Sequence, residues 1–252
     1  MKKGLILATA AFLLIPAFAI TGVKAISEKE ETVIISENSS DITGDGVNEK
    51  ISLNGEPYEE EEQFLKEIYI DVTTSNEKRF TIPLESGEKA SFQLIDFNQD
   101  GVKDIFANVV TGGTDGDIYS YLYTLKDFIR KDLSVPDPLE MDSSFEKGYK
   151  AKLTITATDK TYLFDLKDRK KYYKKLGIYY KGKLNEPTEL TVNTFHSLRP
   201  ANIGGGVIGL KGIQRVTGAA NTDTIAIVES SWKYEDGKWK LIKAEVQNEV
   251  NN

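Results

Sequence analysis

The chain reads Asp-Ile-Thr-Gly-Asp-Gly-Val-Asn-Glu over residues 41–49 and Asp-Phe-Asn-Gln-Asp-Gly-Val-Lys-Asp over residues 96–104. Both stretches carry acids, a glycine and a valine at matching positions, and an offset of about 55 residues separates them, which indicates an internal repeat. Each lies between runs rich in Val, Ile, Thr and aromatic residues. We therefore expect each to be a turn between two strands.

The rest of the chain has the same strand-like character. Short runs such as residues 68–72, 105–110 and 224–232 alternate with turns rich in Gly, Asp and Asn, which predicts roughly fifteen strands. Only residues 165–176 have a helical pattern. One period supplies about four strands, the content of a propeller blade, and about four periods fit the chain. The predicted fold is all-β, a small β-propeller-like array of about four blades, with a two-sheet β-sandwich as the alternative.

The first 25 residues have the parts of a secretion signal. Lys2 and Lys3 precede a mostly apolar run, and Ala25 ends a small-residue cleavage motif, with Ala19 as a second possible cleavage position. An uncleaved membrane anchor is the alternative. We expect a signal peptide at 1–25 and a single all-β domain at 26–252. Its repeats are expected near 32–85 and 91–134, with degenerate repeats continuing to the C-terminus.

Composition narrows the class of protein. The full chain has a net charge of −7, and removal of the signal leaves about 227 residues with a charge of about −10, which argues against duplex nucleic acid as a partner. The chain has no cysteine, so neither disulfides nor a thioether-linked lipid can hold it. We expect a secreted protein, extracellular or associated with the cell wall, without a stable membrane span after signal cleavage.

The two acidic stretches have the residue types and spacing of calcium loops. Ca²⁺ takes six or more oxygen ligands at about 2.5 Å, which a tightly turning chain supplies from alternate positions. Three acids in one turn repel one another unless a cation lies among them. The predicted calcium ligands are Asp41, Thr43, Asp45, Val47 and Glu49 in the first loop and Asp96, Asn98, Asp100, Val102 and Asp104 in the second, with the valines contributing their carbonyl groups.

These loops differ from an EF-hand in two respects. The twelfth position holds Ser52 in the first loop and Ala107 in the second, so the bidentate glutamate is absent, and the flanking residues alternate like strands. The alternative is that both stretches are plain Asp-Gly turns without metal. For a calcium site of this kind we expect a dissociation constant of roughly 10⁻⁴ to 10⁻³ M, which suits extracellular calcium.

At these loops the chain resembles the VCBS and FG-GAP repeat family. It is especially similar to uncharacterised VCBS-repeat proteins exported by spore-forming Gram-positive bacteria, on residues 101–113, 198–200 and 209–215 as well as the loops. The resemblance implies a complete or partial β-propeller, calcium held inside its blades, and adhesion or ligand binding more often than catalysis. The Phe-Gly and Gly-Ala-Pro segments that name FG-GAP repeats are absent from this sequence. The resemblance therefore leaves both a closed and an open propeller as alternatives.

One basic stretch stands out on this acidic chain. Its cations are Lys167, Arg169, Lys170, Lys171, Lys174 and Lys175, with Tyr172 and Tyr173 among them. Such a patch is suited to an anionic cell-envelope polymer or an acidic extracellular protein. The alternative is an exposed helix whose lysines keep the protein soluble.

Catalytic chemistry finds little support in the sequence. His196 is the single histidine, which excludes a histidine-based zinc cluster, and Ser197 beside it points to the other side of a strand. We predict no catalytic residue and no cofactor other than calcium. The predicted function is a secreted, non-enzymatic calcium-binding protein, a binding or cell-envelope-associated module. The alternative is a secreted hydrolase acting on a cell-wall or polysaccharide polymer.

Overall fold

The computed structural model describes residues 32–58, 63–112 and 116–247. Residues Glu31–Asn252 form one compact unit. The predicted signal peptide precedes this unit and lies outside the described residues. Across the described part of the chain, no helix is long and apolar enough to cross a lipid bilayer.

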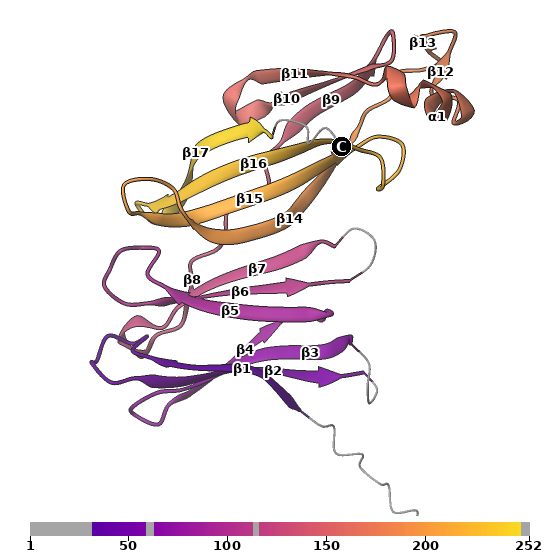
Figure 1. Ribbon diagram of the computed structural model, residues 1–252. Coiled ribbons are helices and arrows are strands. Elements are labelled where there is room, and N and C mark those ends of the chain that lie inside the picture. The colour runs from indigo at the N-terminus through magenta and orange to yellow at the C-terminus, as the bar shows by residue number, and fades with distance from the viewer. Residues whose placement is uncertain (1–31, 59–62, 113–115, 248–252) are drawn as a thin grey trace, which may run out of the picture. The chain divides into compact units, whose positions relative to one another are not determined.

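The first two sheets are antiparallel meanders, in which four strands pair in chain order (Figure 1). The first sheet consists of β1 (Val33–Ser40), β2 (Glu49–Pro57), β3 (Leu65–Thr73) and β4 (Arg79–Leu84). The second consists of β5 (Lys89–Ile95), β6 (Asp104–Val110), β7 (Ile118–Thr124) and β8 (Lys131–Asp132). An acidic loop joins the first strand to the second in both sheets, so the two loops occupy equivalent places.

The second half of the chain forms a three-stranded sheet, a four-stranded sheet and a small helical segment. The third sheet consists of β9 (Met141–Glu146), β10 (Lys150–Ile155) and β11 (Lys160–Asp165), and the fourth of β14 (Thr191–Asn202), β15 (Ile208–Thr217), β16 (Thr224–Glu235) and β17 (Lys238–Val246). Between these sheets lie α1 (Lys170–Lys175) and the short hairpin of β12 (Tyr179–Tyr180) and β13 (Lys183–Leu184). Short 3₁₀ turns occur at η1 (Lys126–Phe128), η2 (Thr156–Thr158) and η3 (Lys167–Arg169).

In the part of the chain that the structure describes, three hydrophobic clusters pack the sheets face to face. The first sheet packs on the second through residues such as Ile51 and Val109. The second also packs on the fourth, where Phe106 meets the cluster that contains Leu210. The fourth sheet packs in addition on the third, through a cluster that includes Tyr173 of α1. The packing order is therefore first, second, fourth, third, which Figure 1 shows as successive layers.

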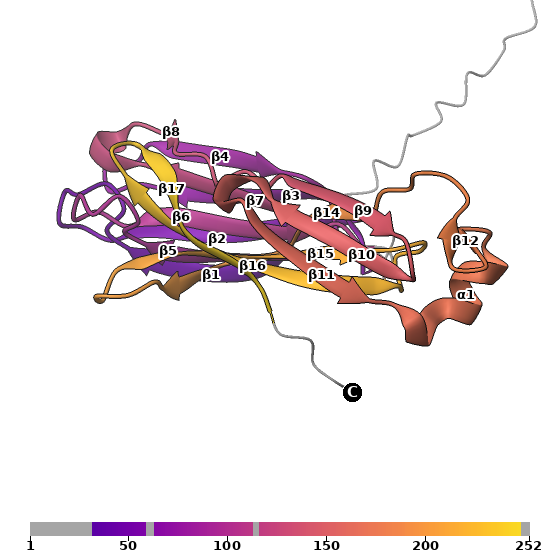
Figure 2. The same cartoon turned by 90° about the horizontal axis from the view of Figure 1, so that it is seen from above.

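Strand β6 lies in an inner sheet, and both of its faces are covered by neighbouring sheets. Ile105, Ala107 and Val109 are buried in the cluster shared with the first sheet, whereas Phe106 is buried in the cluster shared with the fourth. A strand with cores on both faces needs an unbroken apolar run, as residues 105–110 provide except for the half-buried Asn108. Seen from above, the sheets lie over one another, with α1 and the β16–β17 turn at opposite ends of the strands (Figure 2).

The prediction of an all-β fold is confirmed, and α1 lies within the range predicted to be helical. In the described part of the chain no sheet closes into a barrel, and the face-to-face packing of twisted antiparallel sheets fits the β-sandwich alternative. The sheets do not pack in chain order, because the third sheet lies beyond the fourth. A propeller-like array remains a prediction.

Candidate functional site

The two acidic loops turn at glycines with left-handed backbone conformations. Gly46 and Gly101 both have φ of 85°, and an added Cβ would contact nothing within 4 Å at either position. Glycine is therefore needed there for its backbone freedom alone. This is the role expected for the sixth position of each loop.

In the first loop, every carboxylate accepts hydrogen bonds from groups of the protein. Asp41 accepts the Gly44 N–H at 2.6 Å and the Gly46 N–H at 2.8 Å. Asp45 is hydrogen-bonded to the Ser75 hydroxyl, which, together with the Val47 N–H, lowers the pKa of its carboxyl group. These hydrogen bonds hold the backbone of the loop close to its own carboxylate groups.

Glu49 closes the first loop from inside the protein. Its side chain is fully buried, and its Oε2 accepts the Ile42 N–H at 2.8 Å. Its Oε1 accepts the Thr43 hydroxyl at 3.3 Å and the Ser75 N–H at 3.5 Å. Both oxygens of this buried carboxylate therefore have partners, as a buried charge requires.

The second loop has the same framework but a different charge partner. Asp96 accepts the Gly101 N–H at 2.9 Å and the Asp100 N–H at 3.1 Å. Lys126 lies 3.3 Å from Asp100 Oδ2 and also donates to the Asp100 carbonyl at 3.1 Å. Asn98 accepts the Asp100 N–H at 3.0 Å, so this side chain also faces the turn.

Asp104 closes the second loop with one oxygen left over. Its side chain is fully buried, and Oδ2 accepts the Phe97 N–H at 3.0 Å, but Oδ1 has no hydrogen-bond partner among the described residues. Burial raises the pKa of Asp104 to about 6, and repulsion from Asp100 and Asp96 adds to the rise. The Phe97 N–H and the nearby Thr124 hydroxyl act in the opposite direction and lower this pKa. The buried oxygen lacks the partner that Glu49 has in the first loop.

The structure thus brings the five predicted ligands of each set together in one loop. Their carboxylates, however, accept hydrogen bonds from backbone N–H groups of the loop. Within residues 32–58, 63–112 and 116–247, no three acidic or histidine side chains converge as a metal-binding group. The second loop suits a hard cation for two reasons: its side chains supply oxygen ligands, and the buried Asp104 Oδ1 lacks a hydrogen-bond partner. The first loop fits less well, because both oxygens of its buried Glu49 already have donors. Val47 is exposed, whereas Val102 is buried.

The basic stretch is smaller than its sequence suggests. Lys167 pairs with Asp165 at 2.8 Å, and Arg169 pairs with Asp223 at 2.7 Å while donating to the Thr224 carbonyl at 2.8 Å. Four exposed lysines remain, none of which forms an ion pair with a described residue: Lys170, Lys171, Lys174 and Lys175. They all lie on α1, a helix of six residues and fewer than two turns.

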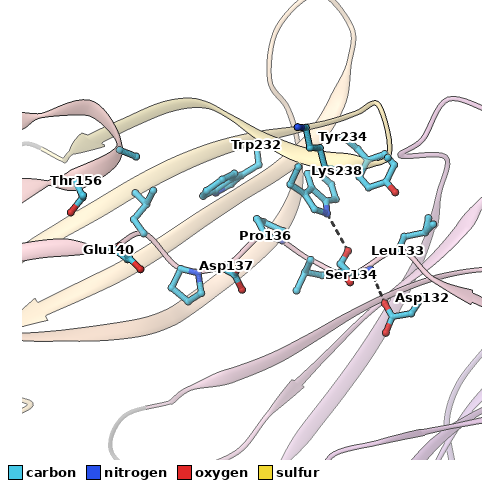
Figure 3. Close-up of a pocket in the computed structure, with 16 residues that line it drawn as sticks. Asp132, Leu133, Ser134, Pro136, Asp137, Glu140, Thr156, Trp232, Tyr234 and Lys238 are labelled. Carbon is cyan, nitrogen blue, oxygen red and sulfur yellow. Dashed lines mark hydrogen bonds between the residues drawn. The ribbon is translucent and has the colours of Figure 1, made fainter.

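A groove that the sequence did not reveal lies between the β16–β17 hairpin and the segment 132–140 (Figure 3). Its volume is about 660 Å³. Three aromatic side chains come from the hairpin, Trp232, Tyr234 and Trp239, and Figure 3 shows Trp232 projecting toward the segment that bears Pro136 and Asp137. The turn between β10 and β11 also lines the groove.

The aromatic side chains are held in fixed positions. Trp239 makes edge contacts with Tyr234 and Phe97, at centroid separations of 5.2 and 5.7 Å, and donates its indole N–H to the Ser134 carbonyl at 3.1 Å. Trp232 donates its indole N–H to the Ser230 hydroxyl at 2.9 Å. Both indole N–H groups therefore already have acceptors within the protein.

One signal in the sequence could have pointed to this groove. Trp232 and Tyr234 are two apart on one strand, and Tyr234 pairs directly with Trp239 across the hairpin. Residues two apart on a strand share a face, as do residues directly opposite one another. A Trp-x-Tyr and Trp hairpin therefore places three aromatic rings on one face, although the opposite wall comes from a segment about 100 residues earlier.

Comparison with known proteins gives relatives without an assigned function. The family described as the YybI C-terminal domain matches residues 139–247, which hold the third and fourth sheets. The uncharacterised protein YybI of Bacillus subtilis (strain 168) is 27% identical over 209 residues, covering 80% of this chain and 79% of that protein. Neither match concerns a VCBS or FG-GAP repeat, so that resemblance remains a hypothesis.

Among solved structures, the chain has a distant likeness to the exotype rhamnogalacturonan lyase YesX. The TM-score is 0.39 at 16% identity, with 87% of this chain and 34% of the lyase covered. This chain thus spans about a third of that enzyme.

Proposed function

We propose that this chain is an exported, non-enzymatic binding protein of the cell envelope, stabilised by calcium. The observation that carries the proposal is the buried Asp104 carboxylate, whose Oδ1 has no partner within the described chain. A buried ionised carboxylate with an unsatisfied oxygen is costly, and a bound cation removes that cost. Asp96 and Asp100 lie close enough to raise the pKa of Asp104, so they add to the attraction for a cation.

The second loop is the stronger candidate site. Its ligands would be the side chains of Asp96, Asn98, Asp100 and Asp104 with the carbonyl of Val102. When bound, calcium supplies positive charge and rigidity and takes no part in chemistry. In the first loop the ligands would be Asp41, Thr43, Asp45, Val47 and Glu49, and calcium there must displace more of the existing hydrogen bonds.

A propeller-like origin belongs to the same proposal. The four-stranded antiparallel meander is the unit of a propeller blade, and the first, second and fourth sheets all have this form. The equivalent placement of the two acidic loops supports repeats of that kind. Export is proposed from the signal-like residues 1–25 alone.

Calcium binding is tested by thermal unfolding of the wild type, Asp104→Asn and Asp100→Ala, with millimolar calcium or with a chelator. At calcium ten times above the dissociation constant, binding stabilises the wild type by about 1.4 kcal/mol. Both variants should lose most of this gain, whereas Asp142→Asn, an exposed acid on β9, should keep it. An identical melting temperature with calcium and chelator would show that the loops are turns only.

The partner in this proposal is an anionic envelope polymer, held by the lysines of α1. Four uncompensated positive charges on one short helix attract a polyanion at low ionic strength. The double variant Lys170→Glu and Lys174→Glu should co-sediment less with isolated cell envelopes than the wild type. The control reverses two other exposed lysines, Lys89 on β5 and Lys147 in the turn between β9 and β10. Equal retention of all three proteins would remove α1 as the docking surface, and release of soluble fragments would instead favour the hydrolase alternative.

A further inference from the structure

The groove between the β16–β17 hairpin and the segment 132–140 has the features of a ligand site. Its volume of about 660 Å³ lies in the range of about 300–1,000 Å³ that is usual for small-ligand pockets. We propose that this groove binds a short stretch of a glycan that carries free, protonated amino groups. The proposal is independent of calcium and of the lysines on α1.

The hairpin wall is aromatic, with Trp232, Tyr234 and Trp239 in the lining. Trp239 is fixed on two sides by Tyr234 and Phe97, and the indole N–H groups of Trp232 and Trp239 are bonded to Ser230 and Ser134. Ligand binding to these rings therefore needs no reorganisation of the side chains, which reduces its entropic cost. Rings without free donors suit a partner whose own faces are C–H groups, as sugar rings are.

In the opposite wall, five residues between Leu133 and Leu139 offer no free backbone N–H group. The N–H groups of Leu133, Ser134 and Leu139 donate to Leu122, Asp132 and Gln214 within the protein. Pro136 and Pro138 have no N–H at all. The wall therefore accepts hydrogen bonds more readily than it donates them, and it suits a ligand rich in O–H and N–H donors.

The charges in the groove point to a cationic ligand. The exposed carboxylates of Asp132, Asp137 and Glu140 line it, whereas Lys238 is the exposed cation of the lining. The carboxyl groups of Asp137 and Glu140 have no ion-pair partner in the described chain. Ammonium groups on a sugar would pair with these carboxylates while the ring faces stack on Trp232 and Trp239, where cation–π attraction also favours them.

A lysine-rich peptide is the competing ligand with the same charge. An extended peptide brings one backbone carbonyl acceptor for each N–H donor. A wall in which Pro136 and Pro138 have no N–H and the N–H groups of Leu133, Ser134 and Leu139 are already bonded leaves most of those carbonyls unpaired. The polyol periphery of an amino sugar avoids this cost, because each hydroxyl donates. The groove chemistry therefore favours the glycan over the peptide.

The test uses the tryptophan fluorescence of the full chain. The protein has two tryptophans, Trp232 and Trp239, and both line the groove, so the signal reports on this site. The probes are a glucosamine hexamer, an N-acetylglucosamine hexamer, which is the uncharged match, and pentalysine. We expect saturable change with the glucosamine hexamer, weakened by added salt, and at least about tenfold weaker binding of the other two probes. Pentalysine binding equal to or tighter than the hexamer, equal binding of the two hexamers, or no change with any probe would each overturn the proposal.

Two sets of variants locate the site. The double variant Asp137→Asn and Glu140→Gln should bind the glucosamine hexamer about five- to tenfold more weakly, because two attractive charges are lost. The control variant Asp168→Asn and Glu67→Gln removes two exposed acids elsewhere and should bind as the wild type does. Both keep the tryptophans and the core, so folding is preserved. An unchanged affinity in the groove variant would overturn the assignment of these carboxylates.

Discussion

The hydroxyl of Tyr173 donates a hydrogen bond of 2.8 Å to Oδ2 of Asp223, which ties α1 to the start of β16. Both side chains are buried, and Arg169 pairs with the other oxygen of the same carboxylate at 2.7 Å. The Ala219 N–H also donates to Asp223, at 3.0 Å. The buried Asp223 carboxylate thus fixes α1 against the turn that precedes β16.

Removing the phenol should loosen this tie. Tyr173→Phe leaves a buried carboxylate with one donor fewer, so we expect a loss of about 1–2 kcal/mol in the free energy of unfolding. Urea denaturation measures the loss. Tyr172→Phe is the matched control, since Tyr172 is exposed and its hydroxyl has no hydrogen bond to a described residue, and it should unfold as the wild type does. If both variants are equally stable, the bond does not contribute.

Asp104 gives the metal-free protein a particular pH dependence. Because burial holds its pKa at about 6 in the folded chain, against an ordinary 3.8, the folded state binds more protons between these values. Stability should therefore fall as pH rises from about 4 to about 6 and then level off. One pKa unit corresponds to about 1.4 kcal/mol, so the fall is about 3 kcal/mol. Urea unfolding at a series of pH values tests this, and Asp104→Asn should flatten that part of the curve.

The equivalent acids of the two loops should respond oppositely to loss of charge. In metal-free protein at pH 7, Asp104→Asn removes an unsatisfied buried charge and should raise stability by about 1–3 kcal/mol. Glu49→Gln removes a carboxylate that accepts three hydrogen bonds and should lower stability by about 1–3 kcal/mol. Chemical denaturation of both variants with a chelator present measures the pair. Changes of the same sign would contradict the difference found between the loops.

Gly209 allows two strands and the side chain of Ile203 to approach closely. A Cβ at this position would lie 2.1 Å from the Trp232 carbonyl oxygen and 2.8 Å from the Ile203 side chain. Gly209→Ala should cost about 1–3 kcal/mol or more, because strand backbone has to move. Gly237→Ala, in the open β16–β17 turn, should cost only about 1 kcal/mol from its positive φ. Thermal unfolding of the two variants compares these costs.

Sequence reasoning predicted the local structure well because its signals are local. The Asp-Gly turns, Gly46 and Gly101, and the strand runs around them depend on neighbouring residues, and the observed loops connect strands as expected. The packing order of the sheets had no such signal. Phe106 meets the fourth sheet across about 100 intervening residues, and periodicity within a strand does not reveal which sheet its outer face meets.

The candidate sites show the same limit. The ninth position of both loops is acidic in the sequence, yet Glu49 reaches three donors and Asp104 leaves one oxygen unpaired, a difference of side-chain length and of partners such as Ser75. Arg169 could not be separated from the exposed lysines, because its partner Asp223 is about 50 residues away. The groove stayed hidden because its two walls are distant in the chain.

The position of the fourth sheet has a consequence for folding order. This sheet contains β17, which ends at Val246, and it covers one face of the second sheet and one face of the third. Two of the three hydrophobic clusters of the described chain therefore stay incomplete until almost the whole chain is available to fold, whereas the cluster between the first and second sheets needs only the first half. Folding is expected to begin from the N-terminal pair of sheets, and a chain that stops before residue 190 leaves two apolar faces uncovered, which exposes it to aggregation and proteolysis.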